Sequence, residues 1–211
     1  MAKMKYDLKR LKRHLRVIRD SIVEKSKGLD FSMMKLTDNH FPKNKSSNYY
    51  GYFMTTEDTI HEGLSRVPVN PAESNFLDVG CGKGICLKVA CEYGFRKVAG
   101  IEFMPDIAAI AKKNMSILKL PAEVFEANAL YFDKYADYDV FYFYNPFNAT
   151  IFKDVIAAID KSLTERPRTI YVIYTSPTSH QLWMDAGFAL VDGYTDQNRG
   201  TQVNIYKKST L

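Results

Sequence analysis

FLDVGCGKG, residues 76–84, decides the fold of this 211-residue chain. It joins an apolar strand, a carboxylate at Asp78 and three alternating glycines. A buried strand that turns sharply into a helix needs glycine, because only glycine permits the dihedrals and lets backbone amides approach a ligand. The helix predicted from Ile85 to about Glu92 would direct its unpaired N-terminal amides at a carboxylate or phosphate. The stretch therefore predicts a cradle for a nucleoside cofactor.

A second apolar run, residues 97–101, ends on Glu102, 18 positions after Gly84, where the acid of a ribose-binding site is expected. A dinucleotide fingerprint needs its third glycine at the sixth position, which here is Ile85. The third glycine stands at the fifth position instead. A phosphate-binding P-loop needs Ser or Thr after its Gly-Lys pair, and Gly84 stands there. The spacing thus disfavours both of these nucleotide sites.

The Asp-x-Gly-x-Gly-x-Gly form resembles motif I of the class I S-adenosylmethionine-dependent methyltransferases, and the resemblance covers roughly residues 50 to 207. It implies that S-adenosylmethionine is the cofactor, with its ribose on Glu102 and its adenine near Phe103 and Asn128. Asn128 could instead cap a turn, and Cys81 could be a spacer in the loop. The cofactor contacts that the resemblance implies are Asp78, Gly80, Cys81, Gly82, Gly84, Glu102, Phe103, Asn128 and Ala129.

The fourth predicted strand, residues 139–144, ends on Asn145-Pro146-Phe147. This triplet resembles a shortened Asn/Asp-Pro-Pro-Tyr/Phe motif of amino-group methyltransferases, from which one Pro is missing. The resemblance implies that Asn145 and Pro146 accept hydrogen bonds from an amino group while Phe147 packs on the substrate. It favours nitrogen over oxygen in an unidentified methyl acceptor, with orientation as the main catalytic effect. The alternative is that Asn145 and Pro146 only end the strand.

Strands and helices alternate along the chain, which predicts a parallel sheet with right-handed crossovers. The expected fold is α/β: a Rossmann-like, seven-stranded, mostly parallel sheet with helices on both faces and a C-terminal antiparallel hairpin. The hairpin is expected of the methyltransferases and not of simple dehydrogenases. The predicted strands are residues 76–79, 97–101, 122–126, 139–144, 168–174, 187–191 and 201–207, and helices are expected after Gly84, Pro105, Asn148 and Pro177.

The chain divides into a basic helical extension with an irregular linker, residues 1–47, and a methyltransferase domain, residues 48–211. Residues 1–27 hold ten Lys and Arg against three acids, a net charge of +7, whereas the whole chain carries +5. A narrow apolar ridge on this basic helix could dock on its own domain, pair with a second copy to form a homodimer, or accompany binding to anionic lipid or nucleic acid. The ridge consists of Leu8, Leu11, Leu15, Ile18 and Ile22.

Residues 48–56 are rich in aromatic rings and precede the glycine turn. By position they resemble the segment that folds over the cofactor in many methyltransferases, and this implies contacts from Tyr52 and Thr55. The alternative is a hydrophobic lid that anchors the N-terminal region on the core.

No apolar run approaches the length of a membrane span, and the N-terminus lacks the apolar core of a secretory signal, so we expect a cytoplasmic protein. Cys81, Cys86 and Cys91 are odd in number and spaced by five, which indicates neither a disulfide framework nor a metal site. Three other classes stay open at this point: a NAD-linked oxidoreductase, a noncatalytic cofactor-binding protein and a nucleic-acid-binding protein.

Overall fold

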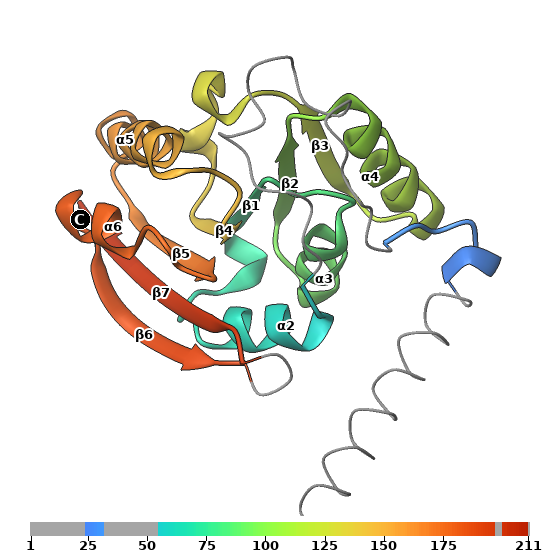
Figure 1. The fold of residues 1–211 in the computed structure, drawn as a ribbon, viewed down its shortest axis with the longest axis horizontal. Coiled ribbons are helices and arrows are strands. Elements are labelled where there is room, and N and C mark those ends of the chain that lie inside the picture. The colour runs from blue at the N-terminus through green and yellow to red at the C-terminus, as the bar shows by residue number, and fades with distance from the viewer. Residues whose placement is uncertain (1–23, 32–54, 197–199, 211) are drawn as a thin grey trace, which may run out of the picture.

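A computed structural model describes residues 24–31, 55–196 and 200–210 (Figure 1). Its centre is a seven-stranded sheet of order β3-β2-β1-β4-β5-β7-β6. The strands are β1 (Asn75–Val79), β2 (Lys97–Glu102), β3 (Ala122–Glu126), β4 (Val140–Tyr144), β5 (Thr169–Thr175), β6 (Ala189–Thr195) and β7 (Gln202–Ser209). The helices are α2 (Glu57–Ser65), α3 (Ile85–Tyr93), α4 (Pro105–Leu118), α5 (Ala149–Glu165) and α6 (His180–Asp185), with short 3-10 turns η3 (Pro71–Glu73), η4 (Ala129–Tyr131) and η5 (Tyr135–Asp137).

The sheet confirms the predicted fold class. β3, β2, β1, β4 and β5 run parallel, and β7 is antiparallel to both β5 and β6. The last hairpin differs from its prediction in one respect, since β6 begins at Ala189 and continues to Thr195. Gly187, at φ +79°, turns the chain after α6, and pairing with β7 carries β6 onward past an irregularity between Leu190 and Asp192. Hydrogen bonds with β7 therefore extend β6 beyond residue 191, where the amino-acid composition predicts that the strand ends.

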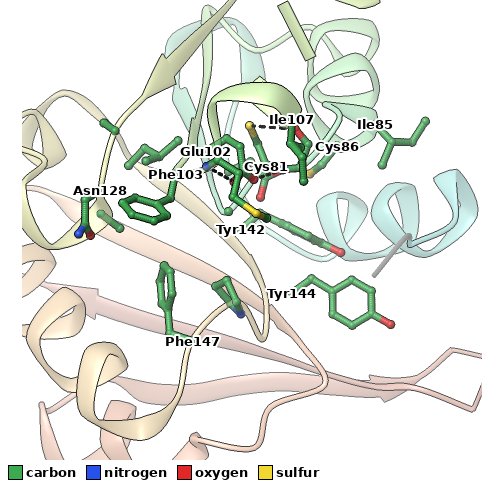
Figure 2. Close-up of a pocket in the computed structure, with 18 of the residues that line it drawn as sticks. Cys81, Ile85, Cys86, Glu102, Phe103, Ile107, Asn128, Tyr142, Tyr144 and Phe147 are labelled. Atoms are coloured by element: carbon green, nitrogen blue, oxygen red, sulfur yellow. Dashed lines mark hydrogen bonds between the residues drawn. The ribbon is translucent and has the colours of Figure 1, made fainter. Parts of the chain in front are cut away.

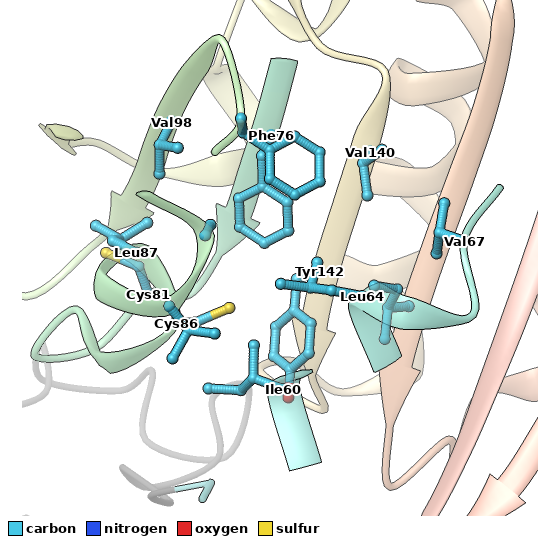
Figure 3. Close-up of a cluster of buried hydrophobic side chains, with 14 of the residues drawn as sticks. Ile60, Leu64, Val67, Phe76, Cys81, Cys86, Leu87, Val98, Val140 and Tyr142 are labelled. Atoms are coloured by element: carbon cyan, nitrogen blue, oxygen red, sulfur yellow. The ribbon is translucent and has the colours of Figure 1, made fainter. Parts of the chain in front are cut away.

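Side chains of the central strands alternate between two apolar layers, as the period of two in a strand requires. Phe76, Val98 and Val140 face α2 and α3, where Figure 3 shows them beside Ile60 and Leu87. Their sequence neighbours face the opposite layer, which α5 and α6 cover. Burial on both faces explains why these strands are continuous apolar runs. Among the described residues, no helix is long and apolar enough to cross a membrane.

A short piece of the N-terminal region also packs on the domain. Residues 24–26 are helical, and Leu29 and Phe31 are buried in the same apolar layer as α2 and α3. Figure 1 shows this segment beside the end of α4. The predicted basic helix lies mostly in residues 1–23, outside the described residues. The division of the chain between residues 47 and 48 stays a prediction, because residues 32–54 are also outside them.

The sheet reverses its direction of growth between β1 and β4. From β1 the chain moves outward to β2 and β3, and it then returns to add β4 and β5 on the other side. Open α/β sheets hold their ligands at such a switch point, outside the carboxyl ends of the strands. The ends of β1, β2 and β4 are therefore where a functional site is expected.

Candidate active site

A cleft of about 920 Å³, counted to its open mouth, lies at this switch point (Figure 2). Eleven of the predicted site residues line it: Thr55, Asp78, Gly80, Cys81, Gly82, Glu102, Phe103, Asn128, Ala129, Pro146 and Phe147. The other lining residues are Ile85, Cys86, Ile101, Met104, Ile107, Ala127, Tyr142 and Tyr144. Of the remaining predictions, Gly84 and Asn145 are not in the lining, and Tyr52 lies outside the described residues.

The glycine loop adopts the backbone that its sequence predicts. Gly80, Gly82 and Gly84 have φ values of +86°, +53° and +88°, in the left-handed region that favours glycine. A Cβ atom on Gly80 would lie 2.8 Å from the Cβ of Pro146, so a larger residue would also push the two sides of the cleft apart. Gly84 does not touch the cleft but forms the N-cap of α3. The loop is thus shaped for close approach of backbone to a ligand.

Glu102 holds this loop from the end of β2. One carboxylate oxygen accepts from Gly82 N at 3.0 Å and the other from Met104 N at 2.9 Å. Burial raises the pKa of Glu102, while the backbone N–H groups that donate to it act in the opposite direction. A carboxylate has about four acceptor positions, so at least one remains for a ribose hydroxyl after the backbone amides of Gly82, Met104 and Phe103. The acid at this place fits a nucleoside.

Asp78, the last but one residue of β1, lines the cleft and is only 3% exposed. Burial, with a smaller contribution from the charge of Glu102, raises the pKa of Asp78 to about 8, and the Cys86 thiol that hydrogen-bonds it acts weakly in the opposite direction. The sequence placed Asp78 beside the cradle rather than in the core, and it is both buried and facing the cleft. A buried carboxyl of this kind suits a cationic ligand, because a nearby positive charge favours its ionised form.

Three predicted residues gather at the opposite end of the cleft. Figure 2 shows Phe103, Phe147 and Asn128 on one side of the view, and all three line the cleft. Asn128 Oδ1 accepts from Leu130 N at 3.0 Å and so caps η4. The amide oxygen of Asn128 therefore caps a turn, as the alternative interpretation expected, although the side chain still lines the cleft. Flat apolar surfaces beside a polar side chain fit an aromatic base.

Asn145 is placed differently from the prediction. Its Oδ1 accepts from the hydroxyls of Tyr174, at 2.9 Å, and Thr178, at 2.7 Å. Two donors already use that oxygen, so accepting from a substrate amino group, as the motif implies, requires one hydroxyl to turn away, and the catalytic role of Asn145 stays a prediction. The backbone of Asn145 has φ +40°, unusual for a non-glycine residue. Asn145 thus shapes the turn after β4, and the neighbouring Pro146 and Phe147 face the cleft.

The lining residues that sequence reasoning missed are mainly apolar or sulfur-containing. Tyr142 and Cys86 are buried in the core as well as facing the cleft, and Tyr142 donates to or accepts from Thr175 Oγ1 at 2.9 Å. In the sequence they belong to apolar runs whose spacing indicates only packing. Tyr144 could have been found, because it is the last residue of the fourth predicted strand. Positions at carboxyl ends of parallel strands face the ligand edge.

A glycine turn after β1, an acid at the end of β2 and a cleft between β1 and β4 define a nucleoside-cofactor protein of the class I methyltransferase type. Residues 76–165 match the family model described as a methyltransferase domain. With the strand order and the hairpin, this match identifies a methyltransferase domain of the class I S-adenosylmethionine-dependent type within residues 76–165. The protein is a methyltransferase with S-adenosylmethionine as its cofactor, which disfavours the NAD-linked alternative.

Solved structures of similar fold agree with this placement. The ribosomal protein L11 methylase from Lactobacillus delbrueckii subsp. bulgaricus is 20% identical, with a TM-score of 0.55 over 75% of this chain and 81% of that one. An RNA methyltransferase from Salinibacter ruber in complex with S-adenosyl-L-homocysteine is 18% identical, with a TM-score of 0.54 over 75% and 95%. Magnesium protoporphyrin IX methyltransferase from Synechocystis PCC 6803 is 12% identical, with a TM-score of 0.55 over 72% and 76%. No curated protein matches the sequence.

Proposed function

We propose that the chain transfers the methyl group of S-adenosylmethionine to a nitrogen atom of an acceptor that reaches the cleft beside Tyr144 and Pro146. The observation that carries this proposal is the glycine loop joined to Glu102 at the switch point of the sheet. In this assignment Glu102 binds the ribose, Phe103 and Phe147 enclose the adenine, and Asp78 faces the cationic methionine portion. Thr55 and Pro146 then border the place where the acceptor enters.

The chemistry supplied by the bound cofactor is an activated methyl group on a sulfonium. The contribution of the chain is therefore to bind and orient, because holding two reactants in line can supply a large part of the rate. Ile101 and Tyr142 are buried and give part of the cleft an apolar lining. Preorganised surroundings of low polarity also favour a reaction in which the charge of the sulfonium is dispersed.

The preference for nitrogen comes from the chemistry of the lining. Among the described residues that line the cleft there is no histidine or lysine, and the two carboxyls belong to Asp78 and Glu102, which are assigned to the cofactor. His180 follows β5, but its Nδ1 lies 2.8 Å from the Tyr206 hydroxyl and its side chain does not line the cleft. A neutral amine attacks with its lone pair and loses its proton afterwards to water, so it needs no positioned base. An alcohol would need one.

Residues 1–27 support an anionic partner. Their net charge of +7 contrasts with about −2 for the other 184 residues, obtained by subtraction from the total of +5. Clustered Lys and Arg attract polyphosphates and other polyanions. If this segment binds a nucleic acid, the affinity of the chain for that nucleic acid should fall steeply as the salt concentration rises. Unchanged affinity of a chain lacking residues 1–27 would remove this partner, and sedimentation of that chain would also test the predicted homodimer.

Calorimetry with S-adenosylhomocysteine tests the cofactor site. Glu102→Ala and Gly82→Val should each weaken binding, because one removes the ribose acid and the other places a β-branched residue at φ +53°. Glu126→Ala is a matched control, since Glu126 pairs with Glu102 in register on the neighbouring strand but is exposed and does not line the cleft. Native affinity in both site variants would refute the assignment.

Transfer of a labelled methyl group to cell extracts, fractionated by acceptor class, tests the reaction. An N-methyl product should survive mild base, whereas a methyl ester would be hydrolysed. An ester or ether product would contradict the nitrogen preference. Tight binding with no transfer to any fraction would favour the noncatalytic alternative.

A further inference from the structure

Residues 29–31, far from the glycine loop in sequence, contact its outer side. The Lys83 ammonium lies 2.8 Å from each carboxylate oxygen of Asp30. Asn114, on α4, completes the contact: its Oδ1 accepts from Asp30 N at 3.0 Å, and its Nδ2 donates to the carbonyls of Asp30, at 2.8 Å, and Lys83, at 3.0 Å. We call Asp30, Lys83 and Asn114 the clasp. It ties three separate parts of the chain together.

The clasp holds the same loop whose other side faces the cofactor cleft. Lys83 stands between Gly82, whose amide donates to Glu102, and Gly84, the N-cap of α3. A Cβ atom on Gly84 would lie 3.3 Å from the Cε of Met115, so this side of the loop is closely packed on α4. A change in the place of Lys83 would therefore move the Gly82 amide away from Glu102.

Charge and burial make Asp30 a stabilising partner of Lys83 in this placement. The Lys83 side chain is 2% exposed, whereas that of Asp30 is 42% exposed. Because a buried ammonium gains from a counter-charge that it contacts directly, loss of the Asp30 carboxylate would weaken the hold on the lysine. Leu29 and Phe31 are buried on both sides of Asp30 and anchor the segment by apolar contact. Residues 29–31 can therefore remain docked when the charge of Asp30 is removed. The effect of that charge on the position of Lys83 can then be measured apart from the docking of the segment.

We propose that Asp30 is a positioning residue for the cofactor cradle, acting through Lys83 and Asn114, so that docking of residues 29–31 and cofactor binding are coupled. This inference rests on the proposed cofactor site. Coupling between two binding events is reciprocal: the docked segment tightens the grip on the cofactor, and the cofactor tightens the docking. The basic residues 1–27 directly precede the clasp. A polyanion bound there would act on cofactor affinity through Asp30.

Binding of S-adenosylhomocysteine to four variants tests the proposal. Asp30→Asn keeps the shape and removes the charge, and it should weaken binding about tenfold, within the range of about 5–150-fold that is typical of such coupling. Lys83→Met removes the buried ammonium, so Asp30→Asn added to it should cause no further loss. Asp192→Asn breaks a surface pair with Arg66, 3.1 Å apart, and should bind as the native chain does. Native affinity in Asp30→Asn, or additive losses in the double variant, would overturn the proposal.

Hydrogen exchange of the native chain gives a second measurement that does not depend on any variant folding. S-adenosylhomocysteine should slow exchange of the Asp30 amide, which donates to Asn114. Any bound ligand slows amides that exchange through global unfolding, so the test applies where the Asp30 amide exchanges faster than the core amides, by local opening. No slowing by the ligand in that range would overturn the coupling. Failure of the native chain to bind S-adenosylhomocysteine would instead refute the proposed cofactor site, and the inference with it.

Discussion

Replacing Asp78 with Asn should stabilise the cofactor-free protein while weakening its cofactor binding. Burial, followed by the charge of Glu102, raises the pKa of Asp78 to about 8 from an ordinary value of 3.8. Between these two pH values the folded chain retains a proton that the unfolded chain has lost. The free energy of unfolding therefore falls as the pH rises through this window, and above the folded pKa the contribution becomes constant. An Asn at this position has the same shape and no such dependence.

The size of the effect follows from the width of that window. Each pH unit inside it changes the free energy of unfolding by about 1.4 kcal/mol. Between pH 5 and pH 7 the native chain should therefore lose about 3 kcal/mol relative to Asp78→Asn. For a chain of this length about 1 kcal/mol corresponds to about 2–4 °C, so the difference between the two melting temperatures should change by about 6–12 °C. Other titrating groups are the same in both proteins and cancel.

Thermal unfolding from pH 5 to pH 9, without cofactor, measures this difference, with Glu126→Gln as an exposed carboxylate control. The same Asp78→Asn protein should bind S-adenosylhomocysteine about tenfold or more weakly, as expected from loss of a charged hydrogen bond of about 1.5–3 kcal/mol. Parallel curves of melting temperature against pH for Asp78→Asn and the native chain would refute the reasoning. Undiminished binding would show that Asp78 does not contact the cofactor.

Three further substitutions test the residues around the cleft. Glu102→Gln keeps one oxygen acceptor where the carboxylate oxygens accept from Gly82 N and Met104 N. Urea unfolding should therefore show a free energy of unfolding lower by about 1.5–3 kcal/mol, and calorimetry a weaker S-adenosylhomocysteine complex. Equal stability would contradict the hydrogen-bond assignment. Gly100→Ala would place its Cβ 2.6 Å from the Cβ of Cys81, and this overpacking should lower stability by about 1–3 kcal/mol in the same assay. Asn145→Ala leaves the Tyr174 hydroxyl without its acceptor and should cost about 1–3 kcal/mol of stability, with affinity for S-adenosylhomocysteine unchanged. A large loss of affinity there would show that Asn145 also contributes to cofactor binding, beyond its predicted catalytic role.

Most of the fold could be predicted because the signals are local. The runs at residues 76–79, 97–101 and 122–126 are strands within one residue of their predicted limits. Their side chains are buried on one or both faces, and composition alone records that burial. The hairpin was less accurate at β6, because pairing with β7 decides how far that strand extends.

The candidate site could be predicted only where backbone geometry or strand position demanded a residue. The glycines at positive φ and the acid after β2 belong to this group, and they lie where expected. Asn145 does not belong to this group, because its predicted role depends on where its side chain points, and strand position does not determine that direction. Its partners Tyr174 and Thr178 are 29 and 33 positions away, on β5 and in the turn after it. No spacing rule within residues 139–147 could supply them.

By itself the sequence determined the nucleoside cradle of this methyltransferase. Glycine dihedrals and the carboxylate of Glu102 are needs of the local backbone, so they are written in residue type and spacing. Only the tertiary structure decided that the amide oxygen of Asn145 is taken by two hydroxyls and that Asp30 reaches Lys83 on the outer side of the loop. Those contacts depend on which side chains meet across the folded chain. The packing of the folded chain brings these side chains together, and the spacing of residues along the sequence does not reveal which of them will meet.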